Sequence, residues 1–243
     1  MTVEGAISVK AVLLSGSRTI EEIYIDKKKK TKDFSFIIRE AEKRGVKIVF
    51  LDKDELSEVA NGRTHGGIAA KVGERVFIDP EQLFAVKNPF IALLEGIEDP
   101  YNFGDSLRSF YAAGATGLIV PKRNWLDAAS TVVKASAGAS EFLPTASCED
   151  LGEVINLSKK YGIKTFCAER CNAVPLYNKD LTCPLIIAIG GELRGLSRKI
   201  TDNSDGNVFI PYGSQFRNAL SASGASAVFA FEIMRQRQQK DDG

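Results

Sequence analysis

The hydrophobic pattern changes character about a third of the way along the 243 residues. The first part alternates short strand-like runs with segments of helical spacing. One predicted helix follows a candidate cap at Asp33, and its apolar face holds Phe34, Ile37, Ile38 and Ala41. The predicted helices cover residues 6–16, 34–45 and 54–60, and the predicted strands cover 21–26, 47–52 and 66–72. These elements predict a compact α/β unit.

From Phe90 onward the apolar runs become longer and more continuous. The predicted strands cover 90–97, 116–121, 164–169, 184–190 and 207–211, and the predicted helices cover 105–114, 126–138, 149–162 and 218–238. Continuous apolar strands separated by helices favour a parallel sheet covered on both faces. The turn formers at the ends of segment 79–89 mark a boundary. We therefore expect an α/β domain over residues 1–82 and a larger one over 88–243.

Composition narrows the class of protein. Hydrophobic residues make up 44% and charged residues 26%, which is typical of a soluble globular protein with a sizeable core. No apolar run approaches the roughly 18 residues that a membrane helix needs, and the N-terminal residues lack the apolar segment of a signal peptide. We expect a cytoplasmic protein with no membrane association.

The charges balance almost completely, because 32 lysines and arginines face 31 acidic residues. No global basic field indicates a nucleic-acid partner, so any binding of a polyanion must be local. The one dense basic run is KKKKTK at 27–32. It is either a solvated loop, the interpretation that we prefer, or a patch for RNA phosphates.

Cysteine and histidine offer little chemistry. The four cysteines do not form a disulfide framework in a chain of this size, and Cys167 and Cys171 lack a second pair of metal ligands. We therefore expect no metal site. The only histidine is His65, which we expect to begin a strand rather than to act as a base.

Three predicted strands of the second domain end in unusual segments. EDPYNFGDSLR follows the strand at 90–97, GELRGLS follows 184–190, and YGSQFRNALSASGAS follows 207–211. Each combines glycine with hydroxyl or charged residues. The carboxyl ends of parallel strands share one edge of a sheet, so we expect these segments to converge on one site. None matches the fingerprints for dinucleotides or nucleoside triphosphates.

In this order, the three segments resemble the three motifs of the SpoU (TrmH) family of the SPOUT class. The first motif matches Asn102, Gly104 and Arg108; the second matches Gly190, Glu192, Gly195 and Leu196; the third matches Ile210, Pro211 and the run ALSAS at 219–223. KASAGASEFLP at 134–144 is similar to a further family segment. The segments G-x-x-x-V at 5–9, SRTIEEIYID at 17–26 and THGGIAA at 64–70 are similar to the small substrate-binding domain of many members.

The resemblance implies a C-terminal α/β domain with a trefoil knot and a mostly parallel sheet, preceded by an L30e-like α/β substrate-binding domain. It implies a homodimeric RNA ribose 2′-O-methyltransferase that uses S-adenosylmethionine and no metal. We favour ribosomal RNA over transfer RNA as the substrate, because of the added N-terminal domain. The alternatives are a catalytically weak or idle RNA-binding protein and an unrelated doubly wound enzyme that acts on a small metabolite.

The resemblance also implies roles for individual residues. The candidate donor-binding residues are Gly190, Gly191, Glu192, Gly195, Ile210, Leu220 and Ser223. The glycines could instead serve tight turns, and Ile210 and Leu220 could simply pack in the core. The candidate catalytic residues are Arg108, Asn102, Glu192 and Ser221.

Arg108 cannot easily act as a base, because a guanidinium stays protonated in proteins. We expect it to clamp RNA phosphate and stabilise charge on the attacking oxygen. Asn102 would position Arg108 or the RNA, unless it only forms an Asx turn. Glu192 would orient the loops, unless it is a plain exposed carboxylate. Ser221 and Ser223 would contact donor or sugar, or else satisfy N–H groups at a helix start.

The third motif departs from the family. Ala219 stands where many members have serine, Ser221 stands where they have asparagine, and Asp105 is unexpected after the glycine of the first motif. These changes indicate either an altered substrate or weaker catalysis.

Overall fold

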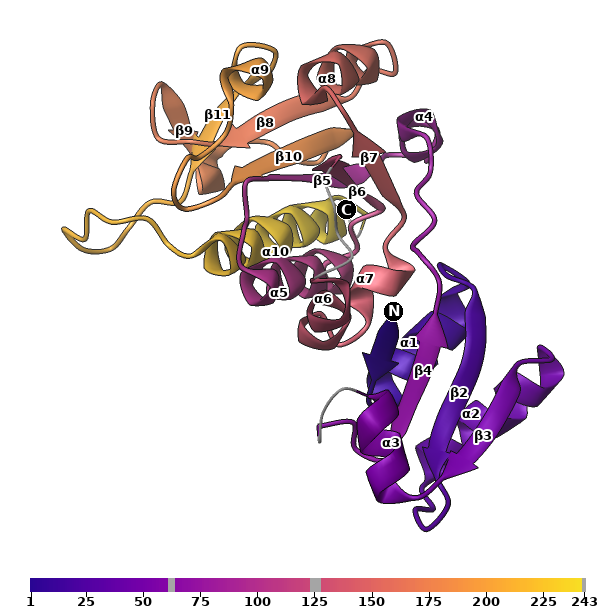
Figure 1. Cartoon of the computed structure of the whole chain (residues 1–243). Coiled ribbons are helices and arrows are strands. Elements are labelled where there is room, and N and C mark those ends of the chain that lie inside the picture. The colour runs from indigo at the N-terminus through magenta and orange to yellow at the C-terminus, as the bar shows by residue number, and fades with distance from the viewer. Residues whose placement is uncertain (61–63, 123–127, 242–243) are drawn as a thin grey trace. The chain divides into compact units, whose positions relative to one another are not determined.

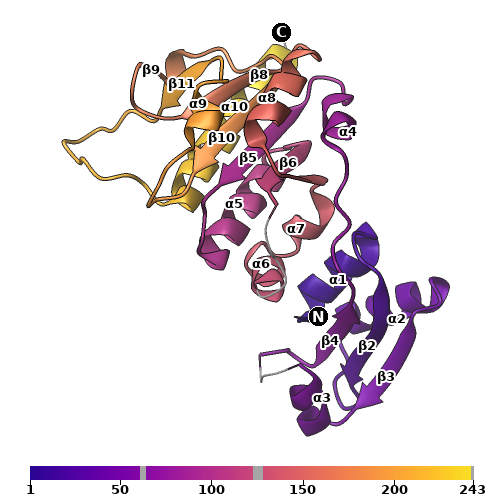
Figure 2. The same ribbon diagram turned by 45° about the horizontal axis from the view of Figure 1, so that its top comes forward.

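The computed structural model describes residues 1–60, 64–122 and 128–241. They form two compact units. Unit 1 holds Met1–Val76 and Asn124–Phe142, and unit 2 holds Phe77–Arg123 and Leu143–Gly243. The segment that leaves the sheet of unit 2 after its second strand therefore contributes helices to unit 1. Figure 1 shows the elements of both units, and Figure 2 shows them from a second direction.

Unit 1 contains a four-stranded mixed sheet in the order β1-β4-β2-β3. Strands β2 and β3 are parallel, while β4 runs antiparallel to both β1 and β2. Its elements are β1 (Thr2–Glu4), α1 (Ala6–Ser15), β2 (Ile20–Asp26), α2 (Lys32–Lys43), β3 (Lys47–Leu51), α3 (Lys53–Val59), β4 (Ile68–Val72), α6 (Ala129–Ala135) and α7 (Ala139–Phe142).

Two local expectations for unit 1 were wrong. The cap of α2 is Thr31, whose Oγ1 accepts a hydrogen bond from the N–H of Phe34 at 3.1 Å, and Asp33 lies inside the first turn. Strand β1 was not expected, because three residues carry no periodic signal of their own and only pairing with β4 defines them. The predicted helix over 126–138 begins outside the described residues; α6 covers Ala129–Ala135 of it, and α7 (Ala139–Phe142) lies beyond its expected end.

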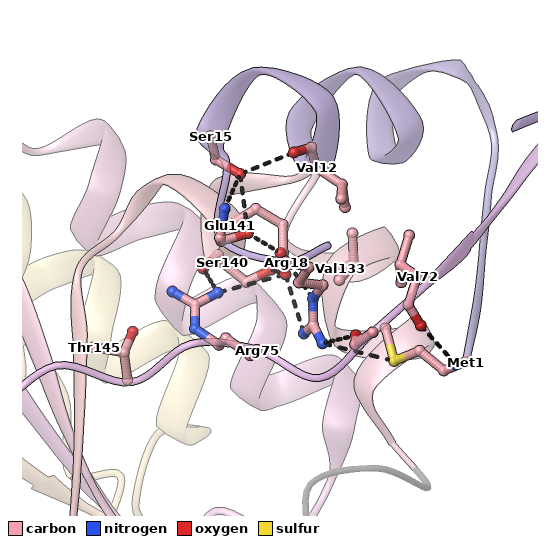
Figure 3. Close-up of polar contacts among 12 residues, drawn as sticks. Met1, Val12, Ser15, Arg18, Val72, Arg75, Val133, Ser140, Glu141 and Thr145 are labelled. Atoms are coloured by element: carbon pink, nitrogen blue, oxygen red, sulfur yellow. Dashed lines mark hydrogen bonds and ion pairs between the residues drawn. The ribbon is translucent and has the colours of Figure 1, made fainter. Parts of the chain in front are cut away.

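A buried ion cluster joins α7 to the rest of unit 1 (Figure 3). The side chain of Glu141 is fully buried and accepts two hydrogen bonds from Arg18, at 2.9 and 3.3 Å. Arg75 lies 3.4 Å from the same carboxylate, and Ser17 donates to it. Burial raises the pKa of Glu141, but the charges of the two arginines and these hydrogen bonds outweigh it, so the pKa falls below its ordinary value.

Unit 2 is built on a seven-stranded sheet in the order β7-β6-β5-β10-β8-β11-β9. Every pair of neighbouring strands in it is parallel. Its elements are α4 (Pro80–Phe84), β5 (Phe90–Glu95), α5 (Pro100–Ala112), β6 (Gly117–Pro121), β7 (Thr145–Cys148), α8 (Leu151–Lys159), β8 (Lys164–Ala168), β9 (Ala173–Pro175), the 3₁₀ turn η1 (Leu176–Asn178), β10 (Leu185–Gly190), α9 (Arg198–Thr201), β11 (Gly206–Phe209) and α10 (Ala222–Asp241).

Helices cover both faces of this sheet, as the continuous apolar strands predicted. Helices α5 and α10 lie on one face, and α8 and α9 lie on the other (Figure 1). Successive residues of β5 serve opposite faces, because Phe90 meets Phe110 of α5 at 6.0 Å between ring centroids while Ile91 packs in the core that contains Leu151 and Ile155 of α8. The expected fold class is thereby confirmed, apart from the knot, which stays a prediction.

Three element assignments differ from expectation, and the first two affect the site. Helix α5 begins at Pro100 rather than near residue 105, because Asp99 caps it by accepting from the N–H groups of Tyr101 and Asn102. Helix α10 begins at Ala222, four residues later than expected. Strand β7 occupies Thr145–Cys148, where no element was assigned. No helix among the described residues is both long and apolar enough to cross a membrane.

Candidate functional site

A cavity of about 310 Å³ lies at the carboxyl ends of β8, β10 and β11, within unit 2. Its walls are largely apolar, with Ile189, Ile210, Leu220 and Phe229 among them. Polar side chains enter from Glu169, Arg170, Glu192 and Tyr212. A mostly apolar pocket with a few polar groups at the ends of parallel strands is the usual form of a ligand site in an α/β fold.

Most candidate donor-binding residues line this cavity. The structure places Gly190, Gly191, Glu192, Gly195, Ile210 and Leu220 in its wall, whereas Ser223 is not among the lining residues. Sequence reasoning missed Glu169, Arg170 and Tyr212. The available signal was the position of Glu169 and Arg170 directly after a predicted parallel strand, which is where ligand-contacting residues gather.

The turn after β10 requires its glycines for backbone reasons. A Cβ on Gly190 would overlap the backbone of Gly195, and a Cβ on Gly191 would overlap the carbonyl oxygen of Gly96. Gly195 has a φ of +62°, a conformation that side chains disfavour. The N–H of Gly191 donates to the carbonyl of Glu95 at 2.8 Å, so this turn is fixed against the end of β5. The tight-turn role considered for these glycines is therefore present in the structure, together with their place in the cavity wall.

Glu192 joins the three motif segments. Its Oε1 accepts hydrogen bonds from Nδ2 of Asn102 and from the N–H of Ala222, each at 3.2 Å. Asn102 lies in the first turn of α5, and Ala222 is the first residue of α10. The carboxylate thus contacts both helix starts beside the turn after β10, and the orienting role that we predicted for it stays a prediction.

The two serines of the third motif extend this network. Oγ of Ser223 donates to Oδ1 of Asn102 at 3.1 Å, and Oγ of Ser221 lies 3.1 Å from that of Ser223. Ser221 also accepts from the N–H of Gly224 at 3.1 Å and so caps α10. The structure therefore shows a capping role for Ser221, and its predicted catalytic role stays a prediction.

Arg108 lies outside the cavity wall of the isolated chain. It is exposed on α5, six residues beyond Asn102, which corresponds to about 9 Å along the helix and about 120° around it. Tyr101 and Tyr111 are also exposed and lie within an arc of about 80° with Arg108. The guanidinium therefore sits in an exposed aromatic stripe, and this chain alone does not bring it to the cavity.

Four exposed arginines border the site, although the chain as a whole is nearly neutral. Among the described residues, Arg108, Arg170, Arg194 and Arg217 are exposed and form no ion pair, and each belongs to an element or loop that borders the site. In the KKKKTK run, Lys27 and Lys28 face Asp52, whereas Lys30 and Lys32 are exposed and form no ion pair among the described residues. Unneutralised guanidinium groups are the residues that bind phosphate best. In the described parts of the chain, no group of acidic, histidine or cysteine side chains could hold a metal ion.

Comparison with known proteins agrees with this geometry. The model of the SpoU rRNA methylase family matches residues 89–231, and a model for RNA 2′-O ribose methyltransferase substrate binding matches residues 2–75. The chain belongs to the SpoU rRNA methylase family. The suspected SpoU/TrmH resemblance is thereby confirmed, and the protein is an RNA methyltransferase of this class.

Individual SpoU/TrmH relatives cover nearly the whole chain. A Staphylococcus haemolyticus protein described as a TrmH family tRNA/rRNA methyltransferase is 31% identical over 100% of this chain and 98% of its own. The Bacillus subtilis protein YacO, described in the same words, is 29% identical over 83% of this chain and 82% of its own.

The SpoU fold is also seen in solved structures. The SpoU methyltransferase AviRb from Streptomyces viridochromogenes matches with a TM-score of 0.83 at 23% identity, over 99% of this chain and 90% of that one. A second structure of AviRb, in complex with the cofactor AdoMet, matches with a TM-score of 0.82 at 22% identity, over 98% and 91% of the two chains.

Proposed function

We propose that this protein transfers the methyl group of S-adenosylmethionine to a ribose 2′-oxygen of ribosomal RNA, and that it does so as a homodimer in the cytoplasm. The observation that carries the proposal is the cavity lined by the second and third SpoU motif segments, to which the carboxylate of Glu192 joins the first segment through Asn102. The solved structure of AviRb with AdoMet supports the identity of the donor. We also propose a trefoil knot in the C-terminal domain.

The residues of the cavity fit S-adenosylmethionine. Ile210, Leu220 and Phe229 offer the apolar surface that an adenosyl group needs. Backbone N–H and C=O groups of the turn after β10 can form hydrogen bonds with the polar atoms of the adenine ring. Glu169 and Glu192 supply negative charge for a ligand that carries a sulfonium. When bound, this donor supplies an electrophilic methyl group.

The RNA side of the reaction would use the arginines. The ribose oxygen forms a bond to the methyl carbon as the carbon–sulfur bond breaks, and the hydroxyl proton leaves to water. A guanidinium cannot take that proton, so Arg108 would bind phosphate and stabilise charge that develops on the oxygen. Asn102 would hold the start of α5 so that this helix presents Arg108 in a fixed direction.

We propose that a second copy completes the site. Arg108 lies in the exposed aromatic stripe with Tyr101 and Tyr111, and Phe231 on the neighbouring helix α10 is also exposed. Burying this stripe against another chain would remove apolar surface from water and could bring the arginine of one subunit to the cavity of the other. Residues 1–82 would form the RNA substrate-binding domain, and residues 88–243 would form the methyltransferase domain.

Methyl-labelled S-adenosylmethionine and total cellular RNA test the proposal. We expect label in the ribosomal RNA fraction, in dinucleotides that resist alkaline hydrolysis, because a 2′-O-methyl group removes the hydroxyl that cleaves the chain. Label in the transfer RNA fraction would show that transfer RNA, not ribosomal RNA, is the substrate. Label in alkali-sensitive nucleotides would show that the methyl group is on a base. Binding of donor and RNA without any transfer would favour the idle RNA-binding alternative.

A further inference from the structure

The loop between β11 and α10 carries an aromatic pair at the edge of the cavity. This loop extends away from the sheet in both views (Figures 1 and 2). Its first aromatic residue, Tyr212, lines the cavity, and its second, Phe216, is 52% exposed. The two ring centroids lie 5.9 Å apart with planes inclined by 35°. An exposed phenyl ring beside a ligand cavity can pack against a part of the bound substrate that lies outside the cavity.

Tyr212 holds a defined position that presents Phe216. Its hydroxyl accepts a hydrogen bond from the N–H of Leu220 at 3.1 Å, so the ring bridges the two ends of the loop. The guanidinium of Arg170, which follows β8, lies 4.4 Å from the centroid of the Tyr212 ring. The loop is therefore anchored at its base by Tyr212 and Arg170, while Phe216 remains uncovered farther out.

The charged side chains around the Tyr212–Phe216 pair indicate which class of molecule it binds. Arg170 and Arg217 flank the aromatic rings in space or in sequence, and neither forms an ion pair among the described residues. Aromatic faces together with unpaired guanidinium groups match an unpaired nucleotide, whose base stacks on the ring while its phosphate meets the cation. An apolar protein surface would not need the two arginines.

We infer that Phe216 stacks on an unpaired base of the substrate RNA and that Arg217 binds the adjacent phosphate, so that this loop positions the nucleotide strand at the cavity. The inference rests on the proposed function, because it names how the same site holds its RNA. It assigns a positioning role, since neither residue touches the reacting atoms.

Two fluorescein-labelled probes separate stacking from charge. One is a single-stranded 12-nucleotide oligoadenylate, and the other is an abasic ribose-phosphate chain of the same length. We expect Phe216→Ala to weaken binding of the oligoadenylate roughly 5- to 140-fold, the effect of losing one base–aromatic stack, and to leave the abasic probe unchanged. Arg217→Gln should weaken both probes. Tyr177→Ala, which removes an equally exposed aromatic side chain on η1, should change neither.

A conservative variant supplies a spectroscopic readout. Phe216→Trp should keep the affinity for oligoadenylate, and its added tryptophan emission should be quenched by that probe but not by the abasic one. If Phe216→Ala weakens both probes equally, leaves both unchanged, or converts a dimer to a monomer in sedimentation, the inference is overturned. The last result would make Phe216 a contact between copies.

The two proposals can fail separately. If the wild-type protein methylates RNA and Phe216→Ala has an unchanged KM for that RNA, the stacking inference fails and the proposed function stands. If the base-dependent binding through Phe216 is observed but no RNA accepts a methyl group, the proposed function fails and the RNA contact stands.

Discussion

A single carboxylate oxygen holds the site together at the scale of residues. Oε1 of Glu192 receives hydrogen bonds from the side chain of Asn102 and from the backbone of Ala222, which belong to helices at opposite ends of the methyltransferase sequence. Hydrogen bonds to a charged acceptor are stronger than those between neutral groups. This carboxylate therefore ties the turn after β10 to the starts of both helices.

Glu192→Ala should weaken S-adenosylmethionine binding about tenfold or more, because both hydrogen bonds are lost and the wall can move. Glu192→Gln keeps an oxygen acceptor and should lose less. Isothermal titration calorimetry measures both affinities. Glu153→Ala, an exposed acid on α8, is the matched control and should bind as the wild type does. Equal affinity of the alanine variant and the wild type for S-adenosylmethionine would contradict the orienting role proposed for Glu192.

Arg108→Ala should lower the rate of methyl transfer about 100- to 1,000-fold, the usual cost of removing one donor that stabilises a developing charge. Binding of S-adenosylmethionine should be unchanged, because the proposed contacts of Arg108 are with the RNA and none of the residues that line the cavity in its own chain is Arg108. Arg198→Ala, an exposed arginine on α9, serves as the control. Full activity of Arg108→Ala in single-turnover assays would contradict the proposed mechanism.

At the scale of elements, the turn after β10 packs its backbone closely against the backbone that follows β5, and only glycine leaves room for this approach. Gly191→Ala should lower the free energy of unfolding by about 3 kcal/mol, since the added Cβ overlaps the carbonyl oxygen of Gly96 and the strand ends must separate. Gly213→Ala is the control, because a Cβ there meets nothing within 4 Å. Chemical denaturation compares the two variants, and equal stabilities would show that the turn adapts.

Helix α7 is held in unit 1 by a buried charge. Glu141→Gln removes the buried carboxylate that Arg18 and Arg75 face and should cost about 3–5 kcal/mol of stability. Because the pKa of Glu141 is depressed, its stabilisation is present above the ordinary value of 4.5 and is lost as the pH falls through the lowered pKa. Wild-type stability should thus fall more steeply with acid than that of Glu141→Gln. Glu58→Gln, an exposed acid on α3, should retain the wild-type profile.

At the scale of the whole molecule, the cavity is built by one chain whereas the proposed reaction needs two. Tyr101→Asp places a charge in the exposed stripe of α5 and should convert the proposed dimer to a monomer in analytical ultracentrifugation. S-adenosylmethionine should still bind, and methyl transfer should be lost. Tyr177→Asp is the control. A monomeric variant that methylates RNA normally would show that Arg108 serves the cavity of its own subunit.

Periodic features could be predicted because they are local. The continuous apolar runs of β5 and β10 required burial on both faces, and the structure gives each strand helices on both sides. Element ends were less predictable, since Asp99 and Ser221 could each be a cap or a loop residue until their hydrogen bonds were known. β1, β7 and β9 were missed, because a strand of three or four residues depends on its partner.

By itself the sequence determined the family, the parallel sheet and the three segments that carry chemistry, because each depends on residue types at short, fixed spacings. Only the tertiary structure decided that Glu192 links Asn102 to Ala222, that Ser221 caps α10 and that Glu141 faces Arg18 and Arg75. It also placed Arg108 outside the cavity wall of its own chain. These pairings join residues that lie far apart along the chain. They depend on the path of the whole backbone, which a local sequence pattern does not specify.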